Sequence, residues 1–96
     1  MKNYIENVEH GVQIRIDCAD VNMKIYDELI SYLDNHADVK PLKKVATFET
    51  PISDYQYKEI LFSVLFDEMV DETFVFVGKE YNYKEIENLI QKFDFS

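Results

Sequence analysis

The clearest pattern of apolar and polar positions is a strict alternation over residues 12–18. The apolar positions are Val12, Ile14, Ile16 and Cys18. Such alternation is typical of a strand with one buried face. Residues 4–8 can pair with this strand through a turn at residues 9–11, so the pattern predicts an N-terminal hairpin.

Two further segments have helical spacing. Asp20 reads as an N-cap, and the helix after it is expected to end near Asn35. Its apolar positions are Met23, Tyr26, Leu29, Ile30 and Leu33. Near the C-terminus, Asn82 and Glu85 have the spacing of a capping box. The apolar stripe of that last helix is Ile86, Leu89, Ile90 and Phe93.

The middle of the chain predicts a short strand over residues 44–50, after Pro41, and then another helix. Ser53 and Gln56 have capping-box spacing at the start of this helix. Its wide apolar stripe is Tyr57, Ile60, Leu61, Phe62, Val64, Leu65, Phe66 and Met69. A stripe of this width predicts a helix that is covered on more than one side.

Residues 73–77 are apolar on both alternating faces, which predicts a central strand ending at Gly78. The resulting order is β-α-β-α-β-α. It favours an α/β fold in which a three- to four-stranded, mostly parallel sheet packs with helices. The alternative is a ferredoxin-like α+β sandwich, which needs one more strand between the two long helices.

Size and composition restrict the number of domains and the location that we expect for the chain. With 96 residues, of which 47% are hydrophobic, residues 1–96 are expected to form one folded domain. No apolar run approaches the roughly 20 residues needed to cross a bilayer. The N-terminal segment carries charges where a signal peptide is apolar. We therefore expect a cytoplasmic protein.

Charge changes the picture most. The net charge is −9, and residues 45–80 carry eight acidic and only two basic side chains. Lys40, Lys43 and Lys44 form the only basic cluster of the sequence. Direct binding to nucleic acid or to an anionic membrane is therefore disfavoured, because both require clustered cations.

Few residues suit catalysis or a cofactor. Two glycines cannot build a P-loop or a dinucleotide-binding loop. Cys18 is the only cysteine, and neither His10 nor His36 is expected within its reach, which favours a small buried residue over a nucleophile. A third interpretation gathers carboxylates at the carboxyl edge of a parallel sheet, where they could hold Mg²⁺. Those carboxylates are Asp17, Asp20 and Glu49. We expect no enzyme activity, metal or cofactor.

The strongest site candidate is a run of acids at the predicted end of the second helix. They are Asp67, Glu68, Asp71 and Glu72. Each acid would oppose the helix dipole there, at a cost of about 0.3–1 kcal/mol. Such locally unfavourable residues occur most often where function requires them. The structural alternative is an ordinary solvated helix end. Further acids that could supplement the run are Asp54, Glu59 and Glu80.

Tyrosines beside these acids are candidate partner anchors, because tyrosine combines a large rigid contact area with a polar tip. Tyr55 follows Asp54, and Tyr81 follows Glu80. In size and charge the chain is similar to bacterial immunity proteins, antitoxins and phage-encoded inhibitors of host defence. That similarity implies a nucleic-acid-mimicking inhibitor that blocks a basic, nucleic-acid-handling protein with a carboxylate-rich surface.

Two other hypotheses stay open. A structural module, acting as a homodimer or a small subunit of a complex, would use negative charge for solubility and the apolar excess of Phe62 and Phe66 for assembly. A small enzyme would use Cys18 or the carboxylate edge.

Overall fold

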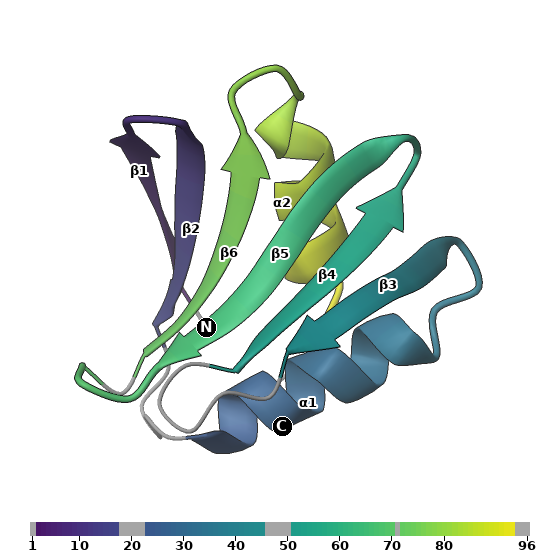
Figure 1. Cartoon of the computed structure of the whole chain (residues 1–96), viewed down its shortest axis with the longest axis horizontal. Coiled ribbons are helices and arrows are strands. Elements are labelled where there is room, and N and C mark those ends of the chain that lie inside the picture. Colours follow the sequence, from purple (N-terminus) through teal and green to yellow (C-terminus); the bar gives the residue numbers. More distant parts are fainter. Residues whose placement is uncertain (1, 18–22, 46–50, 71, 94–96) are drawn as a thin grey trace.

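A computed structural model of the chain describes residues 2–17, 23–45, 51–70 and 72–93. The elements follow in the order β1 (Lys2–Val8), β2 (Gly11–Asp17), α1 (Met23–Asp34), β3 (Val39–Val45), β4 (Ile52–Tyr57), β5 (Ile60–Asp67), β6 (Glu72–Gly78) and α2 (Tyr83–Gln91). The described strands form a six-stranded sheet in the order β1-β2-β6-β5-β4-β3 (Figure 1). Every neighbouring pair is antiparallel.

The prediction of a mostly parallel α/β sheet is therefore wrong, and the fold is α+β. Instead of parallel crossovers, the chain passes from β2 through α1 to the far edge strand β3 and returns by successive hairpins to β6. The ferredoxin-like alternative belongs to the observed α+β class, but its topology differs from the observed one. It needs only one further strand between its helices, whereas four strands separate α1 from α2.

The error came from residues 53–69, which form the β4–β5 hairpin instead of a helix. In β5, alternate side chains are buried against the helices: Ile60, Phe62, Val64 and Phe66. The intervening ones point to the other side: Leu61, Ser63, Leu65 and Asp67. A nearly continuous apolar run matches both the helical and the strand period, so periodicity alone does not separate them. Phe62 and Phe66 are core residues and offer no surface for assembly.

The turn between β4 and β5 also hid the hairpin. Lys58 and Glu59 have φ of 49° and 66°, so both lie in the left-handed region. A two-residue hairpin turn of this kind normally contains glycine or asparagine. Because this turn contains neither, the usual sequence signal of a hairpin is absent.

Four of the predictions are confirmed. These are the N-terminal hairpin, the helix that forms α1, the strand that becomes β6 and the helix that forms α2. Asn82 caps α2, and its side chain accepts a hydrogen bond from the Lys84 N–H at 3.1 Å. The predicted strand over residues 44–50 is displaced: β3 starts at Val39 and contains Pro41, which an edge strand tolerates. Residues 46–50 and the predicted cap Asp20 lie outside the described residues.

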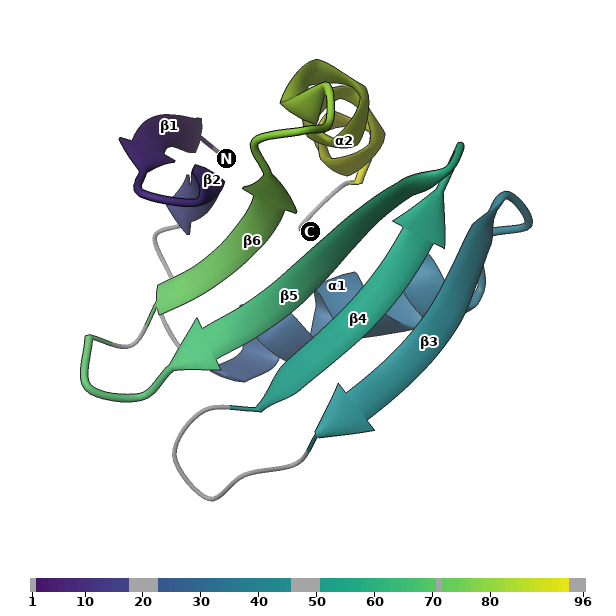
Figure 2. The same ribbon diagram turned by 45° about the horizontal axis from the view of Figure 1, so that its top comes forward.

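Both described helices pack on the same face of the sheet (Figure 2). Their buried side chains are Ile25, Tyr26, Leu29 and Leu33 from α1 and Ile86, Leu89 and Ile90 from α2. The sheet contributes alternate residues of β2, β4, β5 and β6 to the same core. Neither of these helices is long and apolar enough to cross a membrane.

Candidate protein-binding face

The side of the sheet opposite the two helices, which we call the open face, carries a mixed apolar and acidic surface. Strand register aligns its side chains in rows across the sheet. One row is mainly apolar and runs Tyr4, Arg15, Phe74, Leu65, Ile52 and Val45. The next row is mainly polar and runs Glu6, Gln13, Phe76, Ser63 and Asp54. No described helix covers either row (Figures 1 and 2).

Large apolar side chains are exposed on this face. Leu61 of β5 is 46% exposed and Leu42 of β3 is 45% exposed. Exposed apolar side chains that occur singly are ordinary, but a contiguous group rimmed by polar residues marks an interaction surface. Leu61 and Leu42 lie on strands that are separated by β4, and both line the same pocket of the open face.

A pocket of about 280 Å³ lies on this face. Its lining residues come from β3, β4, β5, β6 and the loop before α2: Leu42, Asp54, Tyr55, Leu61, Phe62, Ser63, Phe76, Gly78, Glu80 and Tyr81. Two carboxylates and no cation are among them. Ser63 Oγ donates a hydrogen bond of 2.6 Å to Asp54 Oδ1, which fixes the position of that carboxylate.

Arg15 is the arginine of the open face, and its charge is already engaged. Its guanidinium lies 4.0 Å from Glu6 and 3.9 Å from Glu72. The same group sits 4.8 Å from the centre of the Tyr4 ring. Arg15 is thus shared between two acids, and Lys40 of β3 also lies on the open face, in register with Gln56 and Leu61.

The acidic run Asp67–Glu72 is not a helix end, so the predicted conflict with a helix dipole is wrong. It forms the β5–β6 connection, in which Asp67 and Glu72 are direct cross-strand partners on the open face. The Met69 N–H donates to Asp67 Oδ1 at 3.0 Å, and Glu68 and Met69 are exposed. Asp71 lies outside the described residues.

The structure separates the other predicted partner residues. Asp54, Glu80 and Tyr81 come together at the pocket. Glu59 lies in the β4–β5 turn. The Tyr55 side chain is fully buried on the helix side, at 0% exposure, so it supports the fold and gives the surface no anchor. Sequence reasoning missed Leu42, Leu61, Ser63 and Phe76 as surface-forming residues. Residues 60–66 are apolar at nearly every position, so no alternation in the sequence could have placed Leu61 and Ser63 there.

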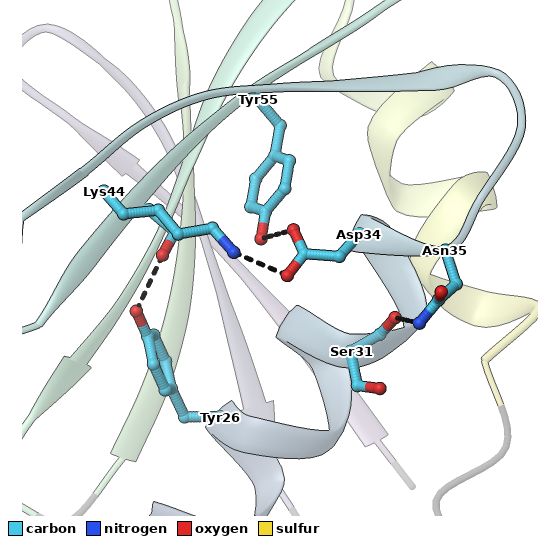
Figure 3. A network of polar contacts seen from close by, with 7 residues as sticks. Tyr26, Ser31, Asp34, Asn35, Lys44 and Tyr55 are labelled. Atoms are coloured by element: carbon cyan, nitrogen blue, oxygen red, sulfur yellow. Dashed lines mark hydrogen bonds and ion pairs between the residues drawn. The ribbon is translucent and has the colours of Figure 1, made fainter.

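Beneath the sheet, a polar cluster joins α1 to β3 and β4 (Figure 3). Tyr55 Oη donates to Asp34 Oδ1 at 3.0 Å, and Lys44 Nζ donates to Asp34 Oδ2 at 2.5 Å. Tyr26 Oη and Ser53 Oγ lie 3.0 Å apart in a buried hydrogen bond. Burial, followed by the hydrogen bond to Asp34, raises the pKa of Tyr55 far above its usual value. Burial likewise raises the pKa of Tyr26. Both phenols therefore stay protonated and act as structural hydrogen-bonding groups.

The described residues contain no group of three or more His, Cys, Asp or Glu side chains that could hold a metal ion. Cys18, Asp20 and Glu49, which the enzyme hypotheses need, lie outside the described residues. The His36 ring packs edge-on against Tyr32 and Tyr57, at centroid distances of 5.6 and 6.2 Å.

Comparisons of the chain with protein families, with curated proteins and with solved structures returned no match. The open face is the feature of the described residues that suggests a function.

Proposed function

We propose that this chain is a non-catalytic inhibitor that binds a basic, nucleic-acid-handling protein through its open face. The observation that carries the proposal is the combination on this face of half-exposed Leu42 and Leu61 with the carboxylates of Asp54, Glu72 and Glu80. An apolar centre with charged surroundings is the usual anatomy of a protein interface.

The charge of the chain gives this proposal a mechanism. A net charge of −9 steers a cationic partner toward the molecule over long range. Carboxylates that then occupy a groove built for phosphates exclude nucleic acid without any chemical step. Exposed Leu42 and Leu61 add apolar contact that nucleic acid does not offer. These apolar contacts would favour a cationic protein over a small cation.

A homodimer through the same face is the second candidate, because the same apolar side chains would be covered. It is disfavoured because two copies, each with a net charge of −9, would bring their acidic faces together. Sedimentation velocity at low and high salt distinguishes the two, since an apolar homodimer becomes more stable as salt screens its repulsion.

The test of the proposed function is capture of a partner by the full chain from nuclease-treated lysate of its own cells. A face variant, Leu42→Ser with Leu61→Ser, removes the exposed apolar contacts. A control variant, Asp27→Asn with Glu28→Gln, removes two charges from α1. We expect one basic protein to bind the wild type and the control but not the face variant.

The captured protein is then purified and its affinity measured against salt. We expect the dissociation constant to rise at least tenfold between 50 and 300 mM NaCl (about 1.4 kcal/mol). Saturation with the chain should also block nucleic-acid binding by the partner. Capture of nothing, equal capture by the face variant, or continued nucleic-acid binding at saturation would each contradict the proposal.

A further inference from the structure

We propose that the pocket on the open face binds the side chain of an arginine presented by the partner; this inference rests on the proposed function. The pocket has an apolar part formed by Leu42, Leu61 and Phe76 and an acidic part formed by Asp54 and Glu80. An arginine side chain matches both parts, because its apolar stem can contact the apolar part while its cationic head contacts the acidic part.

The volume of the pocket suits one side chain. Sites for drug-sized ligands usually occupy about 300–1,000 Å³, whereas this pocket measures about 280 Å³. It is also open to the surface of the sheet, so a residue projecting from another protein can enter without any rearrangement of the fold.

Glu80 is directed onto the open face by the absence of a side chain at Gly78. The buried residues of β6 that face the helices are Thr73, Val75 and Val77, so Gly78 faces the open side. Both carboxylate oxygens of Glu80 lie 2.8 Å from where a Cβ of residue 78 would be. The carboxylate therefore lies against the backbone of β6, beside the pocket.

Asp54 supplies the second carboxylate from β4, held by its hydrogen bond from Ser63. Two acids on separate elements, with no cation among the lining residues, give charge complementarity to a guanidinium. The aromatic residues Phe76 and Tyr81 are also among those that line the site. A planar guanidinium stacks on aromatic rings and is less strongly hydrated than an ammonium, which favours arginine over lysine.

n-Butylguanidinium, a single guanidinium on a four-carbon stem, is the probe that tests the pocket. It is titrated into ¹⁵N-labelled full chain while amide chemical shifts are followed by NMR. We expect saturable shifts at Ser63, Gly78 and Tyr81. Butylamine should bind at least threefold more weakly, and 1-butanol should cause no saturable shift. Equal binding of butylamine would overturn arginine in favour of lysine.

Substitutions then locate the site. Asp54→Asn and Glu80→Gln should each weaken n-butylguanidinium binding at least fivefold, whereas Asp27→Asn on α1 should leave it unchanged. Gly78→Ala keeps every charge but places a methyl group where the Glu80 carboxylate lies. We expect it to weaken binding to a similar extent in a protein that remains folded, because only a flexible side chain has to move.

The two proposals can fail separately. If n-butylguanidinium causes no saturable shift, or binds Asp54→Asn and Glu80→Gln as tightly as the wild type, the arginine pocket is wrong. Partner capture that depends on Leu42 and Leu61 would then leave the proposed function standing. If n-butylguanidinium binds as described but no partner is captured, the proposed function fails. The pocket would then be a guanidinium site without the assigned protein partner.

Discussion

At the scale of single residues, Tyr55 shows how a polar group becomes part of the core. Its ring is fully buried and stacks on Phe62 at a centroid distance of 5.7 Å. Its hydroxyl would be costly to bury alone, but it donates to Asp34. The hydrogen bond therefore connects the end of α1 to the centre of β4.

Removing that hydroxyl should change both stability and its dependence on pH. Tyr55→Phe is expected to lower the free energy of unfolding by about 1 kcal/mol at pH 7. The pKa of Tyr55 is raised in the folded state, so the folded chain favours the neutral phenol. This contribution is fully present below the unfolded pKa of about 10 and is lost as pH rises above it. Urea unfolding between pH 8 and 11 measures the effect.

This prediction is tested by how steeply the free energy of unfolding falls between pH 8 and 11 in each variant. Tyr26 and Tyr32 also have raised pKa values because of burial, so some alkaline loss remains in Tyr55→Phe. We expect a smaller loss in Tyr55→Phe than in the wild type. Identical slopes in Tyr55→Phe and the wild type would show that Tyr55 ionises equally in the folded and unfolded states.

At the scale of elements, the β4–β5 turn stores backbone strain. Left-handed φ values at Lys58 and Glu59 are unfavourable for residues with a Cβ. Glu59→Gly should therefore raise the free energy of unfolding by about 1 kcal/mol. Chemical denaturation measures this gain. Glu9→Gly, in the β1–β2 turn where no positive φ occurs, is the matched control and should give none.

Strand β5 makes a second prediction, because adjacent residues point to opposite faces. Phe62→Ala should cost about 3–5 kcal/mol by leaving a cavity in the core. Leu61→Ala should cost less than about 1 kcal/mol, because nearly half of its side chain is already exposed. Urea unfolding of the two variants checks the strand directly. A helix with the wide apolar stripe predicted from the sequence would bury both residues, and comparable losses would support it.

At the scale of the whole molecule, the excess of negative charge opposes folding while it favours a cationic partner. Like charges are closer together in the folded chain than in the unfolded one, so screening should stabilise the fold. Raising NaCl from 10 to 200 mM is expected to increase Tm by about 4 °C, equivalent to about 1 kcal/mol.

Differential scanning calorimetry measures this salt response. Asp67→Asn with Glu72→Gln removes a directly opposed pair of acids and should reduce the increase. A Tm that falls with added salt would mean that attractive ion pairs, such as Arg15 with Glu6 and Glu72, dominate the electrostatics of the fold.

The sequence by itself determined the elements whose period is unambiguous. Val12, Ile14 and Ile16 alternate with polar residues, so the pattern of β2 fits a strand and does not fit a helix. Asn82 caps α2 ahead of a stripe with helical spacing, so a strand would scatter its apolar residues over both faces. The acidic character of the chain is likewise a property of composition, and it led to Asp54, Glu80 and Tyr81 before their positions were known.

Only the tertiary structure decided the rest. Residues 60–66 are apolar at nearly every position, so helix and strand satisfy the local pattern equally well, and pairing with β4 and β6 selects the strand. That pairing is non-local, as is the sheet order that places β6 between β2 and β5. The pocket joins Leu42, Asp54 and Glu80 from separate elements. Spacing along a chain does not specify such a juxtaposition, because it depends on which strands become neighbours.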